Sequence, residues 1–309
     1  MDDIRTNLRA AMDQQGLTAH YRKLVEMVQQ DHDVQDFLTA HQQDLDAAVL
    51  QKSASKLYEF VTEKAKLKKG QPTFAPGYEP ELVLNDHQIE VAYRPTANQL
   101  EKQQRQASLQ RFQTIGMTTA VKQARLSDYE PTDQRMVAIK AVYDFLEKEH
   151  QVGHGFLPGL YLSGPFGVGK TYLMAAMAQQ LAATGTTVCL VHFPSFAVTM
   201  KGAIGNNQVT EKLNRVKQVP VLIIDDIGAD AMSAWIRDEV LGVILEYRMQ
   251  HELSTFFTSN FTIQQLGDEH LATTSRGDVE PLKAKRLLER IHFLARPIEI
   301  DGKNRRQES

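Results

Sequence analysis

The stretch GPFGVGKT at residues 164–171 decides how this chain can fold. It fits the pattern G-x-x-x-x-G-K-[ST] of loops that bind phosphate groups. Glycines let several backbone N–H groups point at one anion, Lys170 can reach the β- and γ-phosphates, and the Thr171 hydroxyl can hold Mg²⁺. The loop follows an apolar run and opens a helical pattern that ends at Gly185. That strand–loop–helix context makes a ligand-free glycine turn a poor explanation.

The residues that we expect to contact a nucleotide are those of the loop and the first turn of its helix: Gly164, Pro165, Phe166, Gly167, Val168, Gly169, Lys170, Thr171 and Tyr172. Nothing in the sequence identifies the base.

Strands and helices alternate from residue 159 onward. The strand candidates are five apolar runs, at 159–164, 187–193, 219–226, 254–260 and 296–300. They are continuously apolar rather than alternating, which is typical of a parallel sheet covered on both faces. The sequence therefore predicts an α/β domain built on a five-stranded parallel sheet.

Polar side chains stand where two of these strands end. Asp225 and Asp226 close the run VLIIDD, and Asn260 closes TFFTSN. Ligands of open α/β sheets bind at the carboxyl ends of the strands. Asp225 can therefore hold Mg²⁺ together with Thr171, while Asp226 orients or deprotonates the attacking water and Asn260 positions it.

Two further sets of residues can be interpreted either as ordinary structural residues or as functional ones. Arg286 and Arg290 share one face of a helix at 283–297, where they are either solvated charges or arginines delivered to a neighbouring subunit's γ-phosphate. The sequence alone favours solvated charges. Phe193, Phe196 and Lys201 follow the second strand, where they could hold single-stranded DNA or be ordinary core and surface residues.

The chain before the sheet divides into two parts. Residues 1–68 carry helical apolar spacing, and 70–95 contain two β-like runs around Asn85-Asp86, which predicts a hairpin. The following segment is polar and Gln-rich. We therefore expect a small, mainly helical domain at 1–96, a linker at 97–125 and the α/β domain at 126–309.

Composition narrows the class of protein. The net charge is −3, so any contact with nucleic acid must come from a local patch. The only cysteine, Cys189, excludes an internal disulfide and argues against a thiolate zinc site. The sequence has no signal peptide and no apolar run of about 20 residues, so we expect a cytoplasmic protein without a membrane partner.

Several motifs together resemble one family. GLYLSGPFGVGKTYLMAAMAQQL, VPVLIIDDIGADAMSAWIRDEV, TFFTSNF, KAKRLLERI and PIEIDGKNRR look like bacterial replicative-helicase loaders of the DnaI type, which are related to DnaC. GYEPELVLNDHQIEVAYRP is similar to the central segment of that family, so the resemblance covers nearly the whole chain. The phosphate-loop motifs are shared by many ATPases, whereas DIGADAMSAWIRDEV is much more specific.

The resemblance implies an AAA+ ATPase that uses ATP and Mg²⁺. Lys170 and Thr171 match Walker A, and Asp225 and Asp226 match Walker B. By the same matching, Asn260 is sensor 1, Arg290 is an arginine finger acting in trans, and Arg305 is sensor 2, with Arg306 as the alternative.

The resemblance also implies partners. The amino-terminal domain would bind the hexameric replicative helicase, and the ATPase domain would bind single-stranded DNA and associate with copies of itself. Other primosome proteins are further candidate partners, and the implied task is helicase loading in replication initiation and restart.

Two departures from the family stand out. DnaI proteins often hold zinc with Cys and His, but the matching stretch KAKLKKGQPTFAPGYEP has no Cys. We therefore predict no zinc, with packing by Phe74 and Tyr78 in its place. Only DGKNRRQES follows the last strand run, so we expect no full helical lid.

Two alternatives stay open. An IstB-type transposition helper shares the same ATPase core but not a helicase-docking module. A nucleotide-dependent binding protein without meaningful hydrolysis is the other, although the presence of Lys170, Asp225, Asp226 and Asn260 argues against it.

Overall fold

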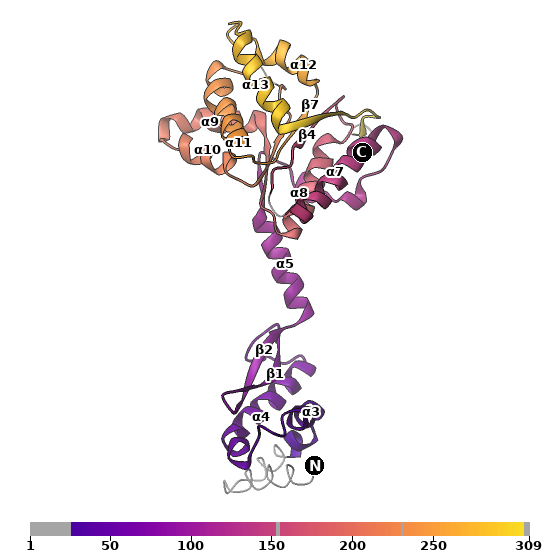
Figure 1. Cartoon of the computed structure of the whole chain (residues 1–309), viewed down its shortest axis with the longest axis vertical. Helices are drawn as coiled ribbons and strands as arrows, with labels where there is room; N and C mark the ends of the chain where they lie inside the picture. The colour runs from indigo at the N-terminus through magenta and orange to yellow at the C-terminus, as the bar shows by residue number, and fades with distance from the viewer. Residues whose placement is uncertain (1–25, 153–154, 230–231, 306–309) are drawn as a thin grey trace. The chain divides into compact units, whose positions relative to one another are not determined.

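The computed structural model describes residues 26–152, 155–229 and 232–305. The chain divides after Gln103 into two compact units, which we call unit 1 and unit 2 (Figure 1). The strands are β1 (Tyr78–Asn85), β2 (Gln88–Pro95), β3 (Phe112–Ile115), β4 (Gly159–Ser163), β5 (Val188–His192), β6 (Val221–Asp225), β7 (Thr255–Ser259) and β8 (Ala295–Glu299).

The α-helices that follow residue 30 are α3 (His32–Ala40), α4 (Ala47–Lys68), α5 (Ala97–Arg111), α6 (Thr119–Lys122), α7 (Asp133–Val152), α8 (Lys170–Thr184), α9 (Phe193–Ala203), α10 (Val209–Lys217), α11 (Gly242–Gln250), α12 (Ile263–Gln265) and α13 (Pro281–Leu294). Two π-helical turns, at Ile236–Leu241 and Leu266–Leu271, precede α11 and follow α12.

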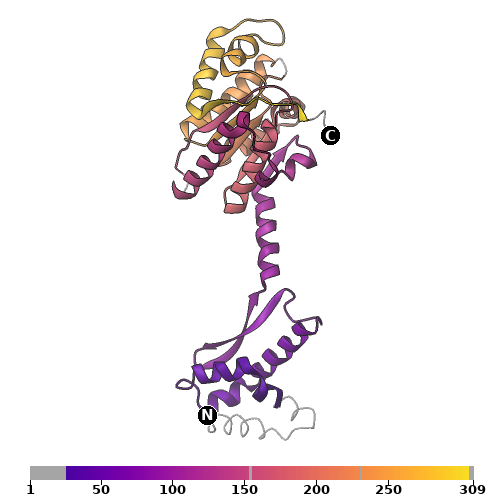
Figure 2. The same cartoon turned by 90° about the vertical axis from the view of Figure 1, so that its right-hand side faces the viewer.

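Unit 1 is a helical module with the predicted hairpin. Asp46 caps α4, because its carboxylate accepts a hydrogen bond of 2.7 Å from the Val49 N–H. The hairpin β1–β2 lies against α4 (Figure 2) and shares a core of buried apolar side chains with it, among them Leu57 and Ile89. The part of the helical prediction that concerns residues 1–25 lies outside the described residues.

The hairpin turn is one residue later than the sequence suggested. Asn85 pairs with Gln88, so Asp86 and His87 are the two central residues, with φ of +46° and +56°. Positive φ at both positions is the geometry of a type I′ turn, whose twist suits a two-residue hairpin.

Phe74 does not pack as the sequence suggested. Its ring stays 79% exposed, while Tyr78 is half-buried. The expectation that Phe74 would fill the place of a zinc site is therefore wrong, because the ring contacts Tyr93 at the surface, with 5.5 Å between ring centroids.

The zinc prediction itself stays a prediction. We expect the purified protein to carry no stoichiometric zinc, because the thiolates of structural zinc sites have no counterpart in this stretch. Within the described ranges, no group of three or more His, Cys, Asp or Glu side chains could hold a metal ion. Elemental analysis that finds about one zinc per chain would contradict this expectation.

Unit 2 is built on a parallel sheet with strand order β3-β5-β6-β7-β4-β8. All five predicted strands are present. The sixth strand, β3, comes from residues 112–115, which the sequence placed in the linker. It was missed because FQTI is short and half-polar, as suits an edge strand with every residue only half-buried.

Both faces of this sheet are covered by helices. Helices α7 and α8 lie on one side of the sheet, and α9, α11 and α13 on the other (Figure 1). On β4, Leu160 and Leu162 belong to the core shared with α7 and α8, whereas Tyr161 belongs to the opposite core. The phosphate-loop strand is therefore buried on both sides, which fixes where the loop leaves the sheet.

Candidate nucleotide-binding site

The phosphate loop joins β4 to α8. Gly169 stands directly before α8 with φ +98°, and Gly167 has φ +77°. A Cβ on Gly167 would lie 1.8 Å from the Asn304 side-chain oxygen. Glycine is favoured there because the backbone is left-handed, and any side chain would also have to displace that of Asn304.

Lys170 is held among oxygen atoms. Its ammonium donates to the carbonyl oxygens of Gly164 and Pro165 at 2.7 and 2.8 Å, and to Asn260 Oδ1 at 2.9 Å. Its side chain is buried, with the residue 8% exposed. The structure thus brings Asn260, at the end of β7, into contact with the lysine of the phosphate loop.

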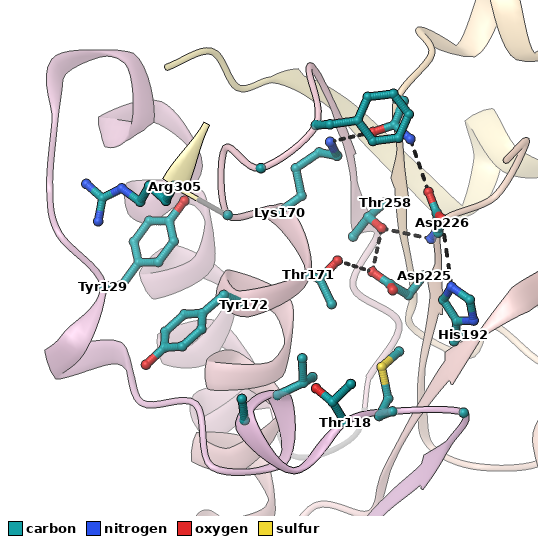
Figure 3. Close-up of a pocket in the computed structure, with 18 of the residues that line it drawn as sticks. Thr118, Tyr129, Lys170, Thr171, Tyr172, His192, Asp225, Asp226, Thr258 and Arg305 are labelled. Atoms are coloured by element: carbon teal, nitrogen blue, oxygen red, sulfur yellow. Dashed lines mark hydrogen bonds and ion pairs between the residues drawn. The ribbon is translucent and has the colours of Figure 1, made fainter. Parts of the chain in front are cut away.

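Asp225 is buried at the end of β6 and holds two hydroxyls. Thr171 Oγ1 and Thr258 Oγ1 each donate to Asp225 Oδ1 at 2.7 Å (Figure 3). Burial raises the pKa of Asp225, and the two hydroxyl hydrogen bonds act in the opposite direction. A hydroxyl beside a carboxylate fits Mg²⁺, which takes oxygen ligands and in phosphate sites needs only one or two from the protein.

Asp226 occupies a different environment from its neighbour. It has φ +61°, an uncommon conformation for a non-glycine residue, and its N–H donates to Thr258 Oγ1 at 3.0 Å. Asn260 Nδ2 donates to Asp226 Oδ1 at 3.2 Å, and His192 Nε2 lies 3.8 Å from Oδ2. The side chain of Asp226 is 32% exposed. Asp225 is thus buried beside two hydroxyls, whereas the carboxylate of Asp226 is partly open to solvent.

A cavity of about 840 Å³ adjoins these groups. It is within the size range of small-molecule sites. One wall is the segment Gly116–Val121, and another is formed by Tyr129 and Tyr172, whose rings stack at 6.1 Å (Figure 3). Stacked tyrosines beside a phosphate loop offer an apolar surface that suits a nucleotide base.

A buried arginine braces this wall. Arg135 is 2% exposed, donates to the Val168 carbonyl at 2.6 Å, and lies 5.0 Å from the Tyr129 ring. The Tyr129 hydroxyl is buried without a hydrogen-bond partner among the described residues. A buried orphan hydroxyl is costly, so it would gain from a polar group of a bound nucleotide.

Sequence reasoning missed His192, Tyr129, Arg135 and the Gly116–Val121 segment. A signal existed for His192, because it ends an apolar strand run, as Asp225 does. Its Nδ1 lies 2.7 Å from Ser195 Oγ at the start of α9. The other residues carry no pattern that marks them, because tertiary folding alone brings them to the cavity.

The two predicted arginines lie in different places. Arg305 lines the cavity, its N–H donates to the Gly167 carbonyl at 3.2 Å, and its guanidinium pairs with Glu130. Arg306 lies outside the described residues. Arg290 does not line this cavity, and it donates to the Gly242 carbonyl at 3.2 Å and pairs with Glu246 on α11.

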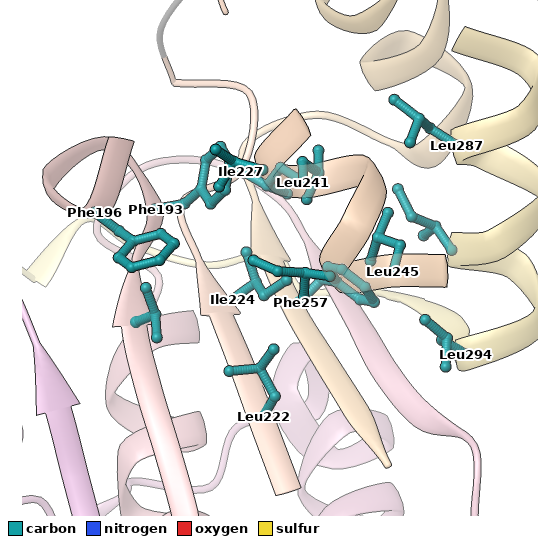
Figure 4. Packing of buried hydrophobic residues seen from close by; sticks show 14 of the residues in the cluster. Phe193, Phe196, Leu222, Ile224, Ile227, Leu241, Leu245, Phe257, Leu287 and Leu294 are labelled. Atoms are coloured by element: carbon teal, nitrogen blue, oxygen red, sulfur yellow. The ribbon is translucent and has the colours of Figure 1, made fainter. Parts of the chain in front are cut away.

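Two of the candidate DNA contacts are core residues. Phe193 and Phe196 are 3% and 1% exposed, within the core under α9 (Figure 4). Neither ring can stack on a base, so the suggestion that they bind single-stranded DNA is wrong for both. The sequence pattern favours an amphipathic helix, because Phe193, Phe196 and Met200 share one helical face that packs into the core. Lys201 is exposed on α9.

No helix in the described part of the chain is long and apolar enough to cross a membrane.

Comparison with known proteins gives matches to both units. A family model described as primosomal protein DnaI N-terminus matches residues 1–93, and one described as IstB-like ATP binding protein matches residues 86–309. The replicative helicase loader DnaI of Bacillus subtilis is 36% identical over 99% of both chains. The replicative helicase loader DnaC of Escherichia coli is 24% identical over 54% of this chain and 68% of its own length.

A solved structure has the same fold as unit 2. The crystal structure of a DnaI is 42% identical, covers 62% of this chain and 98% of its own, and superposes with a TM-score of 0.56.

Proposed function

Because this chain belongs to the DnaI family of replicative helicase loaders, we propose that it uses ATP to load a hexameric replicative helicase onto single-stranded DNA during primosome assembly. The observation that carries the proposal is the similarity to a helicase loader over 99% of the chain, unit 1 included. Replication initiation and restart are the processes in which we expect this loading.

Unit 1 separates this function from its main alternative. The IstB-like match begins at residue 86, so a transposition helper leaves residues 1–85, most of unit 1, without a counterpart. A DnaI-type amino-terminal region at residues 1–93 has no place in that alternative. We therefore assign helicase docking to unit 1 and propose domain borders at 1–96, 97–125 and 126–309, except that β3 and the cavity segment Gly116–Val121, at the end of the linker range, belong to unit 2.

In unit 2 we propose that nucleotide binding acts as an assembly switch. Lys170 binds the β- and γ-phosphates, Thr171 and Asp225 hold Mg²⁺, and Tyr129 and Tyr172 contact the base. Bound Mg²⁺ would neutralise phosphate charge. Asp226 accepts a proton from the attacking water, held in orientation by Asn260 and His192. Hydrolysis is slow in this proposal, because the switch works through binding.

The nucleotide also bears on self-association. An arginine from a second copy would supply positive charge at the γ-phosphate, so that ATP joins neighbouring units. For single-stranded DNA, we propose Lys201 as a contact to a DNA phosphate, because its side chain is exposed on α9, unlike those of Phe193 and Phe196. Other primosome proteins are further proposed partners.

Helicase binding tests the function directly. We expect the full chain to retain the cognate replicative helicase in a pull-down, and a fragment of residues 1–103 to retain it without ATP, since unit 1 has its own apolar core. Binding by the full chain alone would show that the division of labour is wrong. No binding by either, with ATP present, would remove the loader function.

A further inference from the structure

Unit 1 exposes one aromatic side chain on the loop that joins α4 to β1. Phe74 is 79% exposed, compared with 38% for Met27 and 43% for Leu100 in the same unit. A single exposed apolar residue is ordinary, so exposure alone assigns nothing. What sets Phe74 apart is how its loop, residues 70–77, is held.

The loop is fixed through a buried carboxylate. The Phe74 N–H donates to Glu63 Oε2 at 2.6 Å, and Lys66 donates to Oε1 at 2.7 Å. Glu63 is 6% exposed. The Lys66 hydrogen bond, followed by that of the Phe74 N–H, holds the pKa of Glu63 below its ordinary value, so the carboxylate is ionised at neutral pH.

The ring itself also has a fixed support. It contacts Tyr93 of β2, with 5.5 Å between centroids, and the Tyr93 hydroxyl donates to Glu59 at 3.1 Å. The loop is anchored again by Gln71, whose N–H donates to the Lys66 carbonyl at 2.9 Å. The buried Glu63 carboxylate thus helps to fix a loop whose Phe74 ring faces solvent. Such pre-organisation lowers the entropy that a partner must remove on binding.

The surroundings indicate the chemistry of the partner. Lys68 and Lys69 end α4 and are exposed beside the loop. A rigid aromatic anchor with a cationic rim fits an apolar pocket edged by carboxylates on another protein. Surfaces that bind single-stranded nucleic acid instead present successive aromatic rings along a basic groove, and this loop presents one ring.

We propose that the Phe74 loop is the anchor through which unit 1 docks on the replicative helicase, with the ring in an apolar pocket and Lys68 and Lys69 facing its acidic edge. This inference rests on the proposed loader function and names the surface that performs its first step. The buried Glu63 acts through the loop as a positioning residue.

The test measures helicase affinity for full-length variants on immobilised helicase. Phe74→Ala should weaken binding at least about 30-fold, as removal of a central aromatic anchor does. Phe74→Leu keeps most of the apolar area and should lose less. Leu100→Ala is the matched control, an exposed apolar residue of unit 1 on α5 rather than on the loop, and should bind as the unchanged chain.

Two further variants separate anchoring from folding. Glu63→Ala frees the loop but keeps the ring, so it should weaken binding less than Phe74→Ala. Reversing Lys68 and Lys69 to Glu should lower the association rate, most strongly at low salt. ATP binding and thermal unfolding of unit 2 should be unchanged in all variants, since none touches the nucleotide cavity.

The outcomes are distinct. If the unchanged chain binds helicase and Phe74→Ala binds within about threefold of it, an effect below that of a hot spot, the anchor assignment is overturned while the loader function stands. If Phe74→Ala binds helicase normally but no longer binds single-stranded DNA, the anchor assignment is also overturned, and the loop is a nucleic-acid contact instead. Failure of the unchanged chain to bind helicase removes both the inference and the proposed function.

Discussion

Lys170→Ala is expected to weaken ATP binding about 10- to 150-fold, the range for losing hydrogen bonds to a charged group. The lysine ammonium is the group aimed at the β- and γ-phosphates, and in the free protein it already lies among oxygen acceptors, 2.7 to 2.9 Å away. These three acceptors are two backbone carbonyls and one side-chain amide oxygen, none of them a carboxylate. The fold should therefore survive the substitution.

Titration with a fluorescent ATP analogue measures this effect. Lys140→Ala is the matched control, because Lys140 is exposed on α7 and lies outside the cavity. Thermal unfolding of both variants checks that the fold is intact. An unchanged ATP affinity in a folded Lys170→Ala protein would falsify the assignment of the phosphate loop.

Arg290→Ala is expected to bind ATP normally but to lose ATP-dependent assembly and stimulated hydrolysis. An arginine finger contributes about 10³–10⁵ in rate where it is used. We expect a smaller loss here, at least about 10-fold, because the proposed role of ATP is a switch. Arg290 pairs with Glu246 and the Gly242 carbonyl in its own chain. It must release these partners to reach a neighbour, so assembly has to supply the energy for that exchange.

Mixing two inactive variants tests whether Arg290 acts in trans. Arg290→Ala keeps a working nucleotide cavity, and Lys170→Ala keeps a working arginine. Interfaces between the two variants should therefore regain part of the hydrolysis that each lacks alone. Arg286→Ala, which removes an exposed arginine from the same helix, is the control and should behave as the unchanged chain. If the mixed assembly forms and stays inactive, Arg290 is a structural residue that ties α13 to α11.

The predictable part of the fold is the part governed by local pattern. Four buried strands, β4, β5, β6 and β7, read as apolar runs, and the glycines of residues 164–169 mark a left-handed backbone that favours glycine. Asp225 and Asn260 could be placed together because parallel strands end at one edge of a sheet. In the structure Asp225 contacts Thr171 and Asn260 contacts Lys170, so both side chains lie at the phosphate loop.

The missed part depends on tertiary contacts. β3 could not be predicted because an edge strand of four half-buried residues carries no apolar run. Tyr129 and Arg135 reach the cavity from a segment that is distant in sequence from the loop, and no spacing rule links them. The burial of Phe193 and Phe196, in contrast, follows from helical periodicity that the DNA hypothesis overlooked.

The strand order also determines when the nucleotide site is completed as the chain is synthesised. β4 leads into the phosphate loop, yet its neighbours in the sheet are β7 and β8, the last strands of the chain. A domain emerges from the ribosome amino terminus first, and contacts between distant segments must wait for the later one. Unit 1, whose hairpin pairs adjacent segments, can fold early. The growing polypeptide can therefore hold a folded unit 1 well before its nucleotide site is complete.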